Sequence, residues 1–157
     1  MCKYLKITRD PPLTLKSDNL QVIKLYMYVV FSVHNGMCIH NYSMDTTGKG
    51  CIYGSAGKHK INTKSSTESD MVGVSNALPQ VLWTIHFLEA QGYDIKDLVV
   101  YQDNQSTICL CVNGWASSSK CDRHINIRYF FITDQVKSKE VSVEYCPTDE
   151  MIADFFT

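Results

Sequence analysis

The sequence contains no apolar run long enough to cross a bilayer, which takes about 20 consecutive apolar residues in a helix. It opens without the apolar core of a secretory signal, since residues 1–6 carry two lysines. Internal repeats and low-complexity tracts are also missing. These absences predict an intracellular, cytoplasmic protein without a membrane partner.

Net charge is nearly absent. The chain has 15 basic and 16 acidic residues, which gives a formal charge of -1 at pH 7. This balance excludes a generally basic nucleic-acid-binding protein and leaves a local basic patch open. The 157 residues suit one compact domain, large enough to bury a core without disulfide or metal cross-links.

The seven cysteines lack the spacing of a metal site or a disulfide framework. Their number is odd, and no two of them form a CxxC pair. Cys121 and His124 lie three positions apart, but no second pair completes a zinc site. The sequence therefore predicts reduced thiols and no bound zinc.

Hydrophobic periodicity predicts a mixed sheet. Residues 21–34 carry apolar side chains in both alternating registers, which is typical of a central strand buried on both faces. Asn35-Gly36 then indicates a turn. Further strands are predicted at residues 38–46, 50–54, 98–102 and 141–146.

Apolar residues at helical spacing predict a long helix that contains residues 71–88 and ends at Gly92. Pro79 lies inside this helix and is expected to kink it or to split it. Other helices are predicted at residues 105–112, at 124–136 and from Asp149 onward. Three strands followed by alternating helices and strands predict an α/β fold with helices packed on a five-stranded mixed sheet.

Three acidic residues stand at the ends of predicted elements or in the last helix. Glu68 opens the long helix, Asp103 follows a strand, and Asp154 lies near the end of the chain. Each has another interpretation: Glu68 completes a capping box with Ser65, Asp103 suits an Asx turn, and Asp154 suits a solvated helix face. Local sequence leaves these alternatives open. Asp70 is interpreted as a surface acid that the helix dipole favours.

Basic residues gather before the long helix, in a stretch from Lys49 to Lys64 without acidic residues. Such a stretch suits a polyanion, although a solvated loop is the alternative. A second loop adds further basic residues before the helix that begins near His124. The candidate substrate-binding residues are Lys58, Lys60, Lys64, Asn104, Lys120, Arg123 and His124.

Five segments resemble the ribonuclease H (RNase H) region of copia-type retrotransposons in that family's order and spacing. They are INTKSSTESD at 61–70, QVLWTIHFLEAQGY at 80–93, YQDNQST at 101–107, RHINIRYFFITD at 123–134 and EYCPTDEMIADFFT at 144–157. By this resemblance, residues 1–20 form a lead-in from the end of a reverse transcriptase region. Residues 21–157 form a ribonuclease H-like domain that is truncated at its C-terminus.

The resemblance implies a ribonuclease H-like fold. It also implies two-metal hydrolysis, with Mg²⁺ or Mn²⁺, of the RNA strand of RNA/DNA hybrids during reverse transcription. The implied catalytic metal ligands are Glu68, Asp103 and Asp154. The implied partners are the hybrid and the reverse transcriptase region of the same polyprotein.

The chain departs from the family at the first catalytic acid. The family has an aspartate in a pattern like Val-Asp-Ala-Ser-Phe-Ala-Val-His, whereas residues 27–34 read MYVVFSVH and place Tyr28 there. Residues 39–43 replace a Ser-His-Thr-Gly-Gly turn, and the chain stops at Thr157, before the usual tail. Trp115 and Cys121 stand where basic residues are usual.

These departures predict a ribonuclease H-like domain whose catalysis is impaired or absent. Three alternatives stay open. The first is an active nuclease for which the remaining acids suffice. The second is a domesticated module that binds nucleic acid or protein without catalysis. The third is a fragment without a selected role. Cleavage of a labelled hybrid distinguishes the active nuclease from the others.

Overall fold

A five-stranded mixed sheet forms the centre of the computed structural model, which describes residues 15–31, 39–113 and 123–156. The strand order is β5-β3-β2-β6-β7. Strands β2, β3 and β5 form an antiparallel meander, β6 runs parallel to β2, and β7 runs parallel to β6. The predicted five-stranded mixed sheet is confirmed. The strand bounds are β2 Val22–Val30, β3 His40–Thr46, β5 Tyr53–Lys58, β6 Asp97–Gln102 and β7 Ser142–Tyr145.

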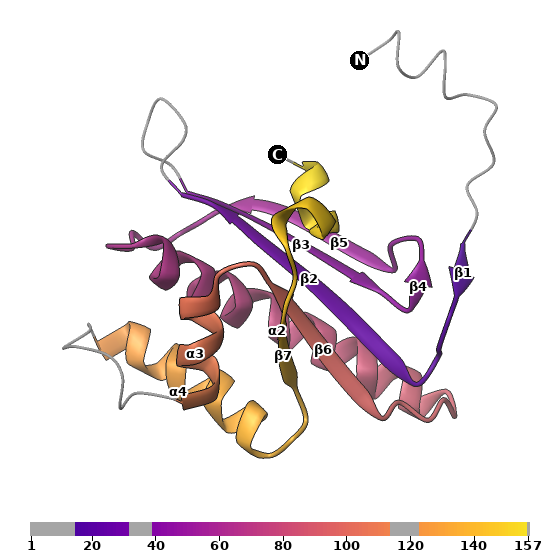
Figure 1. The fold of residues 1–157 in the computed structure, drawn as a ribbon. Coiled ribbons are helices and arrows are strands. Elements are labelled where there is room, and N and C mark those ends of the chain that lie inside the picture. The colour runs from indigo at the N-terminus through magenta and orange to yellow at the C-terminus, as the bar shows by residue number, and fades with distance from the viewer. Residues whose placement is uncertain (1–14, 32–38, 114–122, 157) are drawn as a thin grey trace, which may run out of the picture.

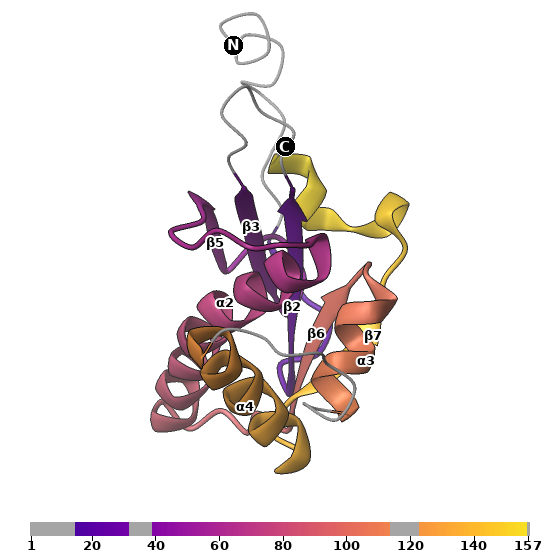
Figure 2. The same cartoon turned by 90° about the vertical axis from the view of Figure 1, so that its left-hand side faces the viewer.

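Helices cover one face of this sheet, as Figures 1 and 2 show. They are α2 (Ser66–Ala90), α3 (Gln105–Asn113) and α4 (Arg123–Lys137). Two short 3-10 segments, η2 (Thr148–Glu150) and η3 (Ile152–Phe156), follow β7, and η3 contacts β2 and β3 from the other face. No helix in the part of the chain that the structure describes is long and apolar enough to span a membrane.

Strand β2 is packed on both faces, as its sequence predicts. Ile23, Leu25 and Met27 are fully buried in the core beneath the helices. Tyr26 and Tyr28 alternate with them and pack on the opposite face with the C-terminal segment. Burying a large apolar side chain contributes about 1.5–3 kcal/mol, so this strand anchors both layers.

Glycine at position 73 lets α2 approach the sheet closely. A Cβ atom on Gly73 would lie 2.5 Å from Met27 Cε and 2.8 Å from Val29 Cγ2. Any larger residue would therefore push the first half of α2 away from β2. This contact places the start of α2 beside the end of β2.

Three details of the predicted elements are wrong. Strand β5 begins at Tyr53 and extends to Lys58, because residues 48–50 form β4 (Gly48–Lys49) and a turn at Gly50 with φ 99°. Helix α2 is not split at Pro79, since the buried neighbours Leu78 and Val81 hold both halves in the core. The last helix is two 3-10 segments instead. The predicted Asn35-Gly36 turn lies outside the described residues.

Asp45 on β3 is a buried acid whose carboxylate accepts no hydrogen bond from any residue that the structure describes. It is 1% exposed and lies opposite Leu25 in the β2–β3 register. Burial raises the pKa of Asp45 from 3.8 to about 7. The unfolded chain ionises this group near its ordinary pKa, while the folded chain keeps it protonated to a higher pH. The free energy of unfolding therefore falls as the pH rises from the ordinary pKa of Asp45 toward its raised value.

We expect Asp45→Asn to raise the free energy of unfolding at about pH 8 by roughly 2–4 kcal/mol, because each unit of pKa shift corresponds to about 1.4 kcal/mol. At about pH 3 the same substitution should have little effect, since the folded and unfolded chains are then both largely protonated at this group. Urea unfolding at the two pH values measures the difference. Asp134→Asn, at an exposed position of α4, is the control. An equal effect of Asp45→Asn at both pH values would contradict this account.

Candidate active site

Three carboxylates lie on elements that adjoin β2, the strand that carries Tyr28. Asp70 lies in the first turns of α2, Asp103 directly follows β6, and Asp154 lies in η3. Strand β2 contacts α2 and η3 and pairs with β6. Burial raises the pKa of the Tyr28 phenol, and the charges of Asp154, Asp103 and Asp70 raise it further. The fold thus joins residues that lie far apart in the sequence.

Asp70 is the acid of α2 that belongs to this cluster. It is 5% exposed, and its Oδ2 accepts a hydrogen bond from Asn104 Nδ2 at 2.8 Å. Burial raises the pKa of Asp70 to about 7; the charge of Asp103 also raises it, and hydrogen bonds from Asn104 and Gln102 lower it. The interpretation of Asp70 as a surface acid is wrong, because α2 lies so close to β2. Helical spacing could have predicted this burial, because Asp70, Gly73 and Ala77 lie on one face of α2 and all three are buried.

Glu68 caps the start of α2. Its backbone N–H donates to Ser65 Oγ at 3.2 Å, and its Oε2 accepts from the backbone N–H of Lys64 at 2.8 Å. These are the contacts of the capping alternative. Asp70 is a further candidate, because its charge, like those of Asp103 and Asp154, raises the pKa of Tyr28. The assignment of Glu68, Asp103 and Asp154 as metal ligands stays a prediction.

The two residues at the end of β6 tie the cluster together. Asp103 accepts hydrogen bonds from Gln102 Nε2 and from Thr148 Oγ1, both at 3.3 Å. Asn104 Oδ1 accepts from the backbone N–H groups of Ser106 at 3.0 Å and Thr107 at 3.4 Å, and so caps α3. Since its Nδ2 binds Asp70, both ends of the Asn104 amide are engaged within the protein. A substrate that binds Asn104, as the sequence predicts, would therefore have to hydrogen-bond to amide atoms that already bind Asp70 and the start of α3.

The cluster does not fit a two-metal centre as it stands. Within residues 15–31, 39–113 and 123–156, no three His, Cys, Asp or Glu side chains are arranged to hold a metal ion. Tyr28 brings a neutral phenol with one oxygen instead of a carboxylate with two. One oxygen of Asp70 accepts the Asn104 amide.

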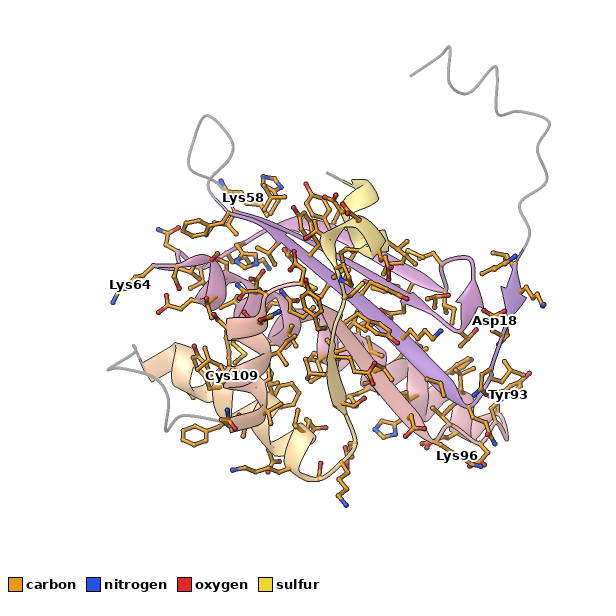
Figure 3. The ribbon with its side chains drawn as sticks, viewed as in Figure 1. Asp18, Lys58, Lys64, Tyr93, Lys96 and Cys109 are labelled. Atoms are coloured by element: carbon orange, nitrogen blue, oxygen red, sulfur yellow. The ribbon has the colours of Figure 1, made fainter. Side chains whose placement is uncertain are left out.

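Exposed lysines lie at the end of β5 and in the loop before α2. Lys58 ends β5, and Lys60 and Lys64 follow it in the loop before α2. Figure 3 shows Lys58 and Lys64 on the side of the molecule where β5 ends and α2 begins. The remaining candidates, Lys120 and the side chains of Arg123 and His124, lie outside the described residues, as do Trp115 and Cys121.

Curated relatives match the sequence, although no protein-family model does. The retrovirus-related Pol polyprotein from transposon RE2 of Arabidopsis thaliana is 32% identical over 157 residues, which covers 99% of this chain and 11% of the polyprotein. That from transposon TNT 1-94 of Nicotiana tabacum is 30% identical over 112 residues, 71% of this chain and 8% of the polyprotein. The chain thus spans about a tenth of the length of these relatives.

Solved structures share the fold. LC11-RNase H1, isolated from compost, has a TM-score of 0.63 at 12% identity over 86% of this chain and 91% of that chain. Its complex with an RNA/DNA hybrid has a TM-score of 0.62 at 10% identity, over 85% and 91%. The protease-reverse transcriptase of prototype foamy virus has 0.55 at 9% identity, over 86% and 18%. With the Pol relatives, this fold shows that the chain belongs to the ribonuclease H-like domains of copia-type retrotransposon Pol polyproteins.

Proposed function

We propose that this chain is a ribonuclease H-like domain that binds RNA/DNA hybrids and has lost most or all of its own cleavage activity. The observation that carries the proposal is the Tyr28 phenol among three carboxylates. The hybrid bound to LC11-RNase H1 supports the class of substrate. The Pol relatives support a place beside a reverse transcriptase region.

The physical reason for lost cleavage is the missing charge at the centre of the cluster. Two-metal hydrolysis needs carboxylates that converge on two divalent cations. Asp70, Asp103 and Asp154 would be three of these, with Asp70 taking the role that the sequence assigned to Glu68. A neutral phenol in the fourth place weakens the attraction for both cations, and its ring fills part of their space. Removing even a single stabilising donor from an active site lowers a rate by about 10²–10³.

Hybrid cleavage by the Tyr28→Asp variant tests this proposal. We expect negligible cleavage of a labelled hybrid by the unmodified chain with Mg²⁺ or Mn²⁺. Tyr28→Asp should raise the rate on the order of 100-fold or more. Tyr28→Phe is the matched control, because it keeps the ring without an oxygen, and it should stay inactive. Robust cleavage by the unmodified chain that Asp103→Asn abolishes would contradict the proposal. Hybrid binding without cleavage in every variant would identify a non-catalytic binding module.

A second substitution series distinguishes Asp70 from Glu68. In the Tyr28→Asp background we expect Asp70→Asn to lower the cleavage rate by about 100-fold or more, since the carboxylate lies in the cluster. Glu68→Gln should leave the rate nearly unchanged and cost at most about 1 kcal/mol of stability through weaker capping. Rates and urea unfolding of both variants give the answer. Loss of cleavage in Glu68→Gln with retention in Asp70→Asn would restore the assignment made from sequence.

The lysines predict salt-dependent binding of the hybrid. We expect alanine at Lys58, Lys60 and Lys64 together to weaken binding at low salt and to flatten the slope of log Kd against log salt by about 2–3, because each phosphate contact contributes about 0.7–0.9 to that slope. Alanine at Lys96, Lys137 and Lys139 is the control, since these exposed lysines lie just before β6 and at or after the end of α4. Affinity of the unmodified chain that does not change with salt would exclude a phosphate-binding role.

A further inference from the structure

The hairpin between β3 and β5 forms a separate contact surface, on the side of the molecule opposite Lys58 and Lys64 (Figure 3). Here β4 pairs antiparallel with β1 (Lys16–Ser17) in a two-stranded sheet of its own. Figure 1 shows this ribbon beside the end of the main sheet. The end of the predicted lead-in thus lies along the domain.

One carbonyl oxygen of the hairpin collects the hydrogen bonds of this segment. Thr47 O accepts from the backbone N–H of Asp18 at 3.0 Å and of Asn19 at 3.4 Å. The Ser17 hydroxyl donates to the same oxygen at 3.3 Å. Three successive residues are therefore bound to one point of the hairpin. The backbone N–H groups of Asp18 and Asn19 are therefore hydrogen-bonded within the protein, as they would be in a short strand.

Two glycines give the segment the space that it occupies. A Cβ atom on Gly48 would lie 2.5 Å from Asp18 N and 2.6 Å from Lys16 O, which are backbone atoms that cannot rotate away. Gly50 has a φ of 99°, and a Cβ atom there would overlap the Leu15 side chain. Only glycine permits such close approach of two backbones. The Thr46 hydroxyl holds this shape, 2.8 Å from the carbonyl oxygens of both glycines.

The chain after this ribbon is also fixed. Gln21 N donates to Asn19 Oδ1 at 2.9 Å, and Gln21 O accepts from Lys96 N at 2.8 Å and Asp97 N at 3.2 Å. The segment is therefore attached to the hairpin on one side and to the start of β6 on the other. Such double attachment is unlike a flexible linker, whose backbone is solvated.

One feature opposes the contact. Lys16 and Lys49 are directly opposite each other in the β1–β4 register, and both are exposed. Like charges in this arrangement destabilise a strand pair. The repulsion makes the contact adjustable, because salt or a charge reversal at Lys16 should strengthen it.

We propose that the Thr46–Gly50 hairpin is a docking site for residues 15–19 of this chain, which fixes the direction in which the polyprotein enters the domain. The polyprotein relatives are about ten times longer than this chain. A docked junction fixes the place on the sheet from which the preceding part of the chain continues. This proposal is independent of whether the domain cleaves.

Amide hydrogen exchange of the full chain, resolved by NMR, tests the docking. The Asp18 and Asn19 amides should exchange at least about tenfold more slowly than unstructured amides. Gly48→Val should remove this protection and leave the Leu25 amide of β2 unchanged. Gly57→Ala is the matched control, because a Cβ atom there meets only Asn41 Oδ1, at 3.9 Å. Lys16→Glu should slow exchange at Asp18 and Asn19, since it converts repulsion into attraction.

Unprotected Asp18 and Asn19 amides in the unmodified chain would overturn the proposal, and so would protection that survives Gly48→Val. If Gly48→Val also exposes the Leu25 amide, the whole domain has opened and Lys16→Glu decides. Exchange at Asp18 and Asn19 that is the same or faster in Lys16→Glu than in the unmodified chain would then overturn docking.

Discussion

The close contact between Gly73 of α2 and the side chains of Met27 and Val29 on β2 determines the geometry of the candidate site. Because no Cβ atom separates the two elements, the first turns of α2 lie against the end of β2. Asp70 is thereby buried near the end of β2, where its charge contributes to the raised pKa of Tyr28. The other two carboxylates come from the end of β6, which is parallel to β2, and from η3 on the far face.

The electrostatics of the cluster follow from this crowding. Burial is the main cause of the raised pKa values of Tyr28 and Asp70, and the charge of Asp103 raises both further. A neutral phenol adds no further negative charge beside these groups. Under the proposed function, the substitution at Tyr28 therefore costs the domain little stability.

The sequence predicted those elements whose residue pattern is compatible with a single structure. The two apolar registers of residues 21–34 predict a central strand, and β2 is buried on both faces. It failed where distant packing decides. Glu68 and Asp70 share one helical turn, and only the approach of α2 to β2 buries Asp70 and leaves Glu68 at the cap. Pro79 predicts a kink or a split of the long helix, and α2 is not split, with Leu78 and Val81 buried on either side of the proline.

Calorimetric titration with Mn²⁺ of the unmodified chain and of Tyr28→Asp tests the central claim, that the Tyr28 phenol prevents cation binding. Its readout does not depend on cleavage or on a nucleic acid. The account predicts no specific binding to the unmodified chain and measurable binding to Tyr28→Asp that Asp103→Asn removes. Binding of Mn²⁺ to the unmodified chain as tight as to Tyr28→Asp would contradict it.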